Sequence, residues 1–189
     1  MRKYVLIGRS GSGKTSVLNE LERLGFQIFD EVPRQVITER NKKFSVRTFG
    51  RIFKEREVVK RQKIIFARHL KKEEEFEKNN TPVLFMERGL IDFIAFTDYL
   101  CGFVPDEFYN PEYNLPNRYN LVFNLENLPF VKDDVRIEKD EEEASVIQDR
   151  VIKTYEDFGY SLINITAKSI KNPAKSIEKR VNLILNYLM

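Results

Sequence analysis

Cysteine and histidine are almost absent from this sequence, which has Cys101 and His69 as its only examples among 189 residues. A single cysteine excludes an internal disulfide and argues against a cysteine-based metal cluster. A single histidine leaves no second candidate for a histidine-based catalytic triad. Cys101 stands among apolar residues, so we expect it to be a small core residue. His69 lies in a charged helical stretch, so we expect it at or near the surface.

Long apolar runs and a large net charge are also lacking. No apolar run approaches the roughly 20 residues of a membrane-spanning helix, and the short basic and apolar start leads to no signal-peptide cleavage site. Lys and Arg total 32 against 29 Asp and Glu, a formal net charge of +3, which gives no case for nucleic acid as the main partner. We therefore expect a cytoplasmic protein without membrane or nucleic-acid partners, as a single domain over 1–189.

Residues 8–15, Gly-Arg-Ser-Gly-Ser-Gly-Lys-Thr, fit the phosphate-binding pattern G-x-x-x-x-G-K-[ST]. The apolar run at 4–7 is typical of a buried parallel strand. After the motif, apolar residues recur on one helical face up to Gly25, a natural helix end. The motif thus has the strand and the helix that it requires on either side. The alternatives are a chance Gly/Ser turn and a dinucleotide fingerprint G-x-G-x-x-G, which fails because position 16 is Ser.

Each residue type in this loop suits a phosphate. Glycines let the backbone wrap so that its N–H groups point at an anion, and the helix N-terminus adds partial positive charge. Lys14 would place its charge on the β- and γ-phosphates, and the Thr15 hydroxyl would ligate Mg²⁺. The sequence therefore predicts ATP and Mg²⁺ as cofactors. The expected nucleotide-binding residues are Gly8, Arg9, Ser10, Gly11, Ser12, Gly13, Lys14, Thr15 and Ser16.

Further apolar runs predict strands at 26–29, 83–86, 121–125 and 160–165. Helices are expected between them, including a long one, or two joined end to end, within 48–78. Its charged part at 71–78 mixes signs at i,i+4 spacing, which favours a solvated face. Strands that alternate with helices predict an α/β protein with a parallel sheet covered on both faces. Ligands gather at the C-terminal ends of the strands in such sheets.

Charged residues follow two of these strand ends. Asp30 and Glu31 follow the second strand, with Arg34 one turn later, and Glu87 and Arg88 follow the third. A carboxylate can hold Mg²⁺ or take a proton from an acceptor hydroxyl, and a guanidinium can neutralise a phosphoryl group in transfer. We expect Glu87 as base or metal ligand, Arg88 as catalytic cation, and the second-strand group as substrate-binding residues. Surface charges at the third strand, and a helix-start ion pair between Glu31 and Arg34, are the alternatives.

The segment at about 126–142 after the fourth strand is rich in charge and indicates an exposed, lid-like excursion, with Lys132 and Arg136 near its tip. A lid that closes over the phosphates would exclude water and supply cations. Arg136 is therefore a candidate catalytic residue, with a solvated charge as the equal alternative. Arg150 on the following helix is a further candidate for the same role.

The whole set of motifs resembles known proteins over nearly the full chain. The segments that carry the resemblance are 8–15, 30–37, the Glu-Arg-Gly-Leu-Ile-Asp stretch at 87–92, 133–136 and 155–160. Their order resembles nucleoside and nucleotide kinases, and more closely the small P-loop AAA-domain ATPase family, which is related to the bacterial nicotinamide riboside kinase domain. That family more often has Asp where Glu87 stands and Gly where Asp134 stands. No arginine-finger or hexamer signature accompanies it.

The resemblance implies a three-layer P-loop NTPase fold with a five-stranded parallel sheet in the order 2-3-1-4-5 and a lid after strand four. It also implies that the Glu after the third strand serves as base and that the Arg contacts phosphates.

Two functions are compatible with the sequence. The first is a Mg²⁺-dependent kinase that moves the γ-phosphoryl group of ATP to a nucleoside-like or related small molecule, as a monomer or homodimer. Its catalytic residues would be Lys14, Glu87, Arg88 and Arg136. The alternative is a nucleotide-dependent switch or binding module with slow hydrolysis. The guanine-specific Asn/Thr-Lys-x-Asp string is absent, which favours ATP over GTP.

Overall fold

The computed structural model describes residues 1–29, 55–79, 81–126, 140–166, 170 and 172–188. Four of the predicted site residues lie outside the described residues: Asp30, Glu31, Arg34 and Arg136. The same holds for most of the lid-like segment and for the first part of the long helix expected within 48–78.

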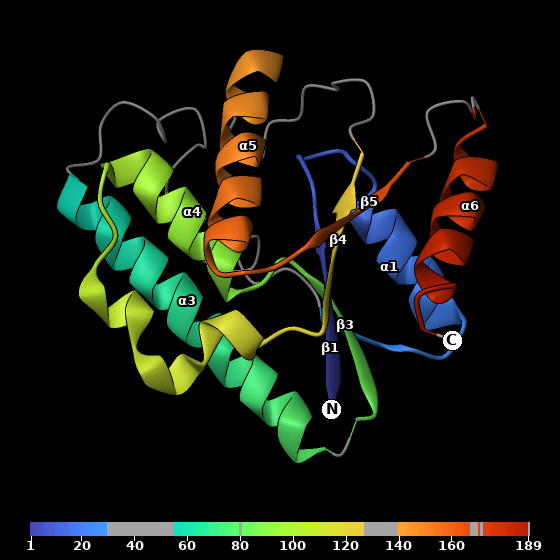
Figure 1. Ribbon diagram of the computed structural model, residues 1–189, viewed down its shortest axis with the longest axis horizontal. Helices are drawn as coiled ribbons and strands as arrows, with labels where there is room; N and C mark the ends of the chain where they lie inside the picture. Colours follow the sequence, from blue (N-terminus) through green and yellow to red (C-terminus); the bar gives the residue numbers. More distant parts are fainter. Residues whose placement is uncertain (30–54, 80, 127–139, 167–169, 171, 189) are drawn as a thin grey trace, which may run out of the picture.

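A single parallel sheet of five strands organises the described chain, in the order β2-β3-β1-β4-β5 (Figure 1). This confirms the predicted α/β fold and strand order. The strands are β1 (Arg2–Ile7), β2 (Gln27–Phe29), β3 (Val83–Glu87), β4 (Leu121–Leu125) and β5 (Leu162–Ile165). β1 lies at the centre of the sheet and pairs with both β3 and β4. The register sets Leu6 opposite Glu87, so β1 and β3 end side by side.

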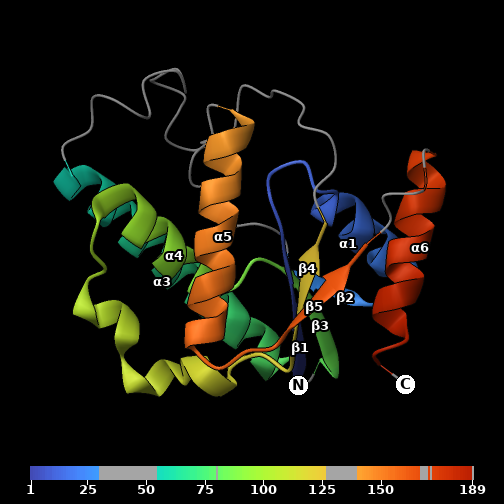
Figure 2. The ribbon, with the colours of Figure 1, turned by 45° about the horizontal axis from the view of Figure 1, so that its top comes forward.

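Helices cover both faces of the sheet, which completes three layers. They are α1 (Lys14–Arg23), α3 (Glu55–Lys78), α4 (Leu90–Cys101), α5 (Glu141–Asp157) and α6 (Pro173–Leu185). The helices α3, α4 and α5 lie on one face, and α1 and α6 lie on the other (Figures 1 and 2). Three short 3-10 helices connect α4 to β4, at Asp106–Tyr109, Pro111–Tyr113 and Leu115–Asn117.

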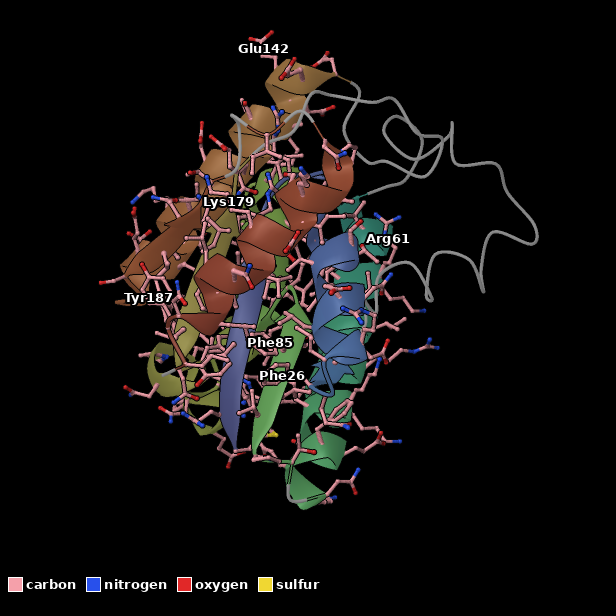
Figure 3. All side chains as sticks on the ribbon, turned by 90° about the vertical axis from the view of Figure 1, so that its right-hand side faces the viewer. Phe26, Arg61, Phe85, Glu142, Lys179 and Tyr187 are labelled. Carbon is pink, nitrogen blue, oxygen red and sulfur yellow. The ribbon has the colours of Figure 1, made fainter. Side chains whose placement is uncertain are left out.

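Two apolar cores result, one on each face, because successive strand residues point to opposite sides. In β1, Val5 and Ile7 pack toward α3, α4 and α5, whereas Tyr4 and Leu6 pack toward α1 and α6. This double burial explains the unbroken apolar run at residues 4–7. Figure 3 looks onto the layer of α1 and α6 and labels Phe85 of β3.

Three sequence expectations outside the candidate site are wrong. His69 is fully buried, with its ring 4.4 Å from that of Phe29 and 5.0 Å from that of Phe93. Glu73, expected on a solvated helix face, is also fully buried. Cys101 ends α4 and is half-buried rather than a core residue. The charge pattern of α3 indicated an exposed Glu73, because the pattern does not show that Lys3 and Arg118, from other parts of the chain, contact this side chain.

Within the described ranges, no helix is both long and apolar enough to cross a membrane.

Candidate functional site

The loop between β1 and α1 turns sharply because glycines occupy its strained positions. Gly8, Gly11 and Gly13 have φ values of 149°, 79° and 85°, which residues with a side chain rarely adopt. A Cβ atom on Gly8 would also lie 2.7 Å from Ser12 Oγ and 2.9 Å from the Leu125 carbonyl oxygen. Glycine is therefore required there both for conformation and for space.

The helix α1 begins where the loop ends, with Gly13 as its N-cap. The backbone N–H of Val17 donates to the Gly13 carbonyl at 3.0 Å, which starts the helical ladder. An α-helix leaves its first N–H groups without helical acceptors, and such an N-terminus binds anions well. Ser10 is half-buried, and Gly11, Thr15 and Ser16 are exposed, so a ligand can reach this part of the loop.

Lys14 folds back inside the loop. Its side chain is buried, and its Nζ donates to the carbonyl oxygens of Gly8 at 3.0 Å and Arg9 at 3.1 Å. The same Nζ lies 3.9 Å from Glu87 Oε1. The Lys14 ammonium group therefore lies between the phosphate loop and Glu87 at the end of β3, the two segments that the sequence predicts to form one site.

Thr15 and Glu87 touch directly. The Thr15 hydroxyl donates to Glu87 Oε2 at 2.9 Å, and the Glu87 side chain is buried. A hydroxyl and a carboxylate oxygen are ligands that suit Mg²⁺, which commonly takes one or two protein oxygens and completes its shell with phosphate and water. The residues present therefore fit the predicted metal. Across the described ranges, no group of three or more His, Cys, Asp or Glu residues forms a metal site made of protein alone.

Arg88 occupies a strained backbone position and is turned toward α4. Its φ of 68° is uncommon for a residue with a side chain. Its backbone N–H donates to the Leu6 carbonyl at 3.2 Å, which ties the turn to the end of β1. Its guanidinium donates to Asp92 Oδ1 at 3.2 Å and lies 4.8 Å from the centre of the Phe96 ring.

Asp92 is a residue of this site that sequence reasoning gave no role. Its Oδ2 accepts hydrogen bonds from the Gly89 N–H at 2.9 Å and from the Tyr155 hydroxyl at 2.7 Å. Its position three residues after the helix-capping Gly89 was the available signal. Burial, followed by the charge of Asp92, raises the pKa of Tyr155 well above its usual range, so this hydroxyl keeps its proton and remains a donor.

Tyr119 supports the same turn from another direction. Its hydroxyl accepts from the Leu90 N–H at 2.7 Å and donates to Glu73 Oε1 at 3.1 Å. Burial raises the pKa of this hydroxyl also, so Tyr119 stays protonated. A Cβ atom on Gly89 would lie only 2.7 Å from the hydroxyls of Tyr119 and Tyr155. The turn after β3 is thus packed closely on both sides.

Glu73 is linked to the turn after β3 through the Tyr119 hydroxyl. Its Oε2 accepts from Lys3 Nζ at 2.9 Å and from Arg118 Nε at 2.8 Å, and its Oε1 lies 3.2 Å from His69 Nε2. Burial alone would raise the pKa of Glu73, but the neighbouring His69, Arg118 and Lys3 together lower it to about 2. Glu73 is therefore a buried carboxylate that is ionised at neutral pH.

Two further arginines contact the phosphate loop region. Arg9, predicted as a nucleotide-binding residue, is buried and reaches α5, where its Nη2 lies 3.2 Å from Glu141 Oε1. Arg180, which sequence reasoning missed, donates from α6 to the Ser12 carbonyl and, at 3.2 Å, to the Glu126 carbonyl. Arg150, a candidate lid arginine, pairs with Asp98 of α4 at 2.5 Å.

Comparison with known proteins identifies a family for this chain and structures that share its fold. A family model described as an AAA domain matches residues 3–172. The structure of deoxyadenosine kinase from M. mycoides with bound dATP superposes with a TM-score of 0.64 and 19% identity, over 100% of this chain and 99% of that chain. Thymidylate kinase from Ehrlichia chaffeensis gives 0.61 and 15%, over 100% and 98%. NadR protein in complex with NR gives 0.64 and 13%, over 98% of this chain and 50% of that chain.

A short stretch of the sequence also matches a curated relative. Over 35 residues it is 60% identical to a nucleotide-binding protein of Psychrobacter cryohalolentis, which is 18% of this chain and 11% of the length of that relative. The solved structures, at below 25% identity, show a common fold. Together with the family match over residues 3–172, they show an α/β fold that this chain shares with solved kinases.

Proposed function

Since the chain belongs to the AAA-domain family, we propose that it is a Mg²⁺-dependent kinase that transfers the γ-phosphoryl group of ATP to a hydroxyl of a nucleoside-like small molecule. The observation that carries the proposal is the contact of Glu87 with the phosphate loop: its carboxylate accepts from Thr15 at 2.9 Å and lies 3.9 Å from Lys14 Nζ. At this position the carboxylate can act on Mg²⁺ or on an acceptor hydroxyl. The solved kinases with the same fold support a nucleoside-like acceptor.

In this proposal, the phosphate loop holds the triphosphate through its backbone N–H groups and Lys14 Nζ. Mg²⁺, held by the oxygens of Thr15 and Glu87, would neutralise charge on the β- and γ-phosphates. The acceptor oxygen forms a bond to the γ-phosphorus while the bond to the β-phosphate oxygen breaks, and ADP leaves. Glu87 acts either as this metal ligand, with the proton of the acceptor hydroxyl passing to water, or as the base that takes that proton. Arg88, held by Asp92, stabilises the charge that develops on the transferring group.

Four residues outside the described ranges complete the proposal. Asp30, Glu31 and Arg34 follow β2 in the sequence, and β2 pairs with β3, the strand that ends at Glu87. We assign them to acceptor binding. Arg136 lies in the segment after β4 and would add a cation over the phosphates.

The experiment is a transfer assay with ATP labelled in the γ-phosphate and a panel of nucleosides and vitamins. We expect a labelled phosphate ester with at least one nucleoside-like acceptor, formed by the wild type and by the surface control Glu156→Gln. Label found only as inorganic phosphate, with every acceptor, would overturn the kinase and leave a nucleotide-dependent switch or binding module. A separate thermal-shift measurement, which compares the melting temperatures with ATP and with GTP, tests the choice of nucleotide.

A further inference from the structure

Arg180 joins the C-terminal helix to the backbone of the phosphate loop. We infer that Arg180 is a positioning residue that fixes the Ser12–Gly13 peptide in the orientation needed to bind phosphate. This inference rests on the proposed function, since it concerns how the same loop receives a triphosphate. The inference assigns a role to the C-terminal helix, which in the sequence is distant from every motif of the site.

The environment of Arg180 is unusual for an arginine. Only 1% of the residue is exposed, and its two terminal nitrogens donate to the carbonyl oxygens of Ser12 and Glu126. The Glu126 carboxylate acts on it through space without a described ion pair, and its Nε has no hydrogen-bond partner among the described residues. Burying a cation without a close counter-ion is unfavourable. An apolar side chain would fill this position between α6 and α1 at lower cost, so packing alone does not explain an arginine here.

The geometry of the peptide unit supplies the explanation. A trans peptide is planar, so the Ser12 carbonyl and the Gly13 N–H point in opposite directions. Arg180 holds the carbonyl on the side of α6, and the Gly13 N–H is therefore directed away from α6. Gly13 caps α1, at the N-terminus where an anion binds. A flipped peptide would place a carbonyl oxygen, which repels phosphate, where this N–H now points.

The loop needs such a restraint because its backbone is permissive. Glycine reaches both positive and negative φ at little cost, so the φ of 85° at Gly13 is not enforced by the residue itself. An interaction with the neighbouring carbonyl is a direct way to select one peptide orientation. The positive charge of Arg180 also raises the potential felt by an anion in the loop.

The fork of the guanidinium matters as well as its charge. Its two terminal nitrogens reach two carbonyls that lie 114 residues apart in the sequence, at the phosphate loop and just after β4. A lysine carries the same charge on a single nitrogen and lacks this fork. Arg180→Lys therefore separates the effect of charge from that of geometry. Lys179, the exposed neighbour labelled on α6 in Figure 3, provides the matched control as Lys179→Met.

The test measures binding of inorganic tripolyphosphate and of ATP by calorimetry to folded wild type, Arg180→Met, Arg180→Lys, Lys179→Met and Lys14→Ala. We expect Arg180→Met to weaken both ligands about tenfold or more, as for loss of a charged hydrogen bond. The affinity of Arg180→Lys should lie between those of Arg180→Met and the wild type, and Lys179→Met should bind both ligands as the wild type does. In ¹⁵N spectra, the Gly13 amide should shift on adding tripolyphosphate in the wild type and not in Arg180→Met, a signature that a purely structural role would not produce.

The outcomes separate the inference from the proposed function. Wild-type protein that binds neither tripolyphosphate nor ATP overturns the proposed function. Wild-type binding that Lys14→Ala abolishes, together with an Arg180→Met affinity within about twofold of wild type, overturns the positioning role alone. If Arg180→Met does not fold, Arg180→Lys decides: wild-type affinity and a wild-type Gly13 shift would overturn the inference.

Discussion

The Thr15 hydroxyl donates a hydrogen bond to Glu87 Oε2 at 2.9 Å, across 72 residues of sequence. The first residue belongs to the phosphate loop and the second ends β3. Their contact follows from the pairing of β1 with β3, which sets Leu6 opposite Glu87. A metal that replaces the proton between these two oxygens would be held by both segments at once.

Replacing Thr15 by valine tests that shared metal position. Thr15→Val keeps the shape of the side chain and removes the oxygen, so we expect Mg²⁺ to lose its ability to strengthen ATP binding. The measurement is the ATP dissociation constant with Mg²⁺ and with a chelator, for the variant and for Thr154→Val as control. A Mg²⁺ effect in Thr15→Val as large as in wild type would contradict the assignment of this hydroxyl.

The hydrogen bond from Tyr155 to Asp92 predicts a stability effect. Tyr155→Phe removes a buried donor to a carboxylate, and we expect the free energy of unfolding to fall by about 1.5–3 kcal/mol. Urea titration measures it, with Tyr187→Phe as control because Tyr187 is 54% exposed. A loss no larger than that of the control would show that Asp92 does not depend on this hydroxyl.

Gly89 is predicted to tolerate no side chain. Its φ of −125° is open to any residue, so the obstacle is space: a Cβ atom would lie 2.7 Å from two tyrosine hydroxyls. We expect Gly89→Ala to reduce stability by about 1–3 kcal/mol through overpacking, and to reduce turnover by displacing Glu87 and Arg88.

Gly159→Ala is the comparison for this substitution. A Cβ atom there meets nothing within 4 Å, although the φ of 88° is strained. It should lower stability by about 1 kcal/mol while turnover of the folded protein stays at the wild-type value. Equal turnover in both glycine variants would contradict the packing account of Gly89.

The buried Glu73 predicts how stability responds to acid. Its pKa falls from an ordinary 4.5 to about 2 in the folded protein, so ionised Glu73 stabilises the fold above pH 4.5. That contribution, about 3 kcal/mol, should be lost as pH falls from 4.5 toward 2, because the unfolded chain binds the proton first.

Urea titrations at several pH values measure this response in wild type, Glu73→Gln and the exposed control Glu74→Gln. We expect Glu73→Gln to be less stable at neutral pH, since Lys3 and Arg118 lose their buried partner, and to show a smaller decline in acid. An identical acid decline in Glu73→Gln and Glu74→Gln would rule out Glu73 as its origin.

Local patterns in the sequence were sufficient for the elements and for much of the site. The run at 121–125 predicted β4 with its observed bounds, and Gly25, expected as a helix end, follows α1 with a φ of 94°. The sequence predicted that the phosphate loop and Glu87 lie close together, because parallel strands end at one edge of a sheet. Their catalytic roles stay predictions.

Contacts between distant segments could not be predicted in the same way. Glu73 meets Lys3 and Arg118, which are 70 and 45 residues away, so its helix pattern indicated an exposed charge. Arg180 lies 168 residues from Ser12, in a helix whose sequence carries no recognisable motif. Such residues are identified by their burial and by their contacts with distant segments, and both are visible only in the folded chain.

The proposed function and the role of Arg180 both depend on residues 8–16 holding a triphosphate, and calorimetric titration of ATP with Mg²⁺ tests that claim most directly. The wild type should bind, and Lys14→Ala should bind at least about tenfold more weakly while keeping the wild-type circular dichroism spectrum. Equal affinity in the two folded proteins would contradict the assignment of the loop, and with it the account of the site.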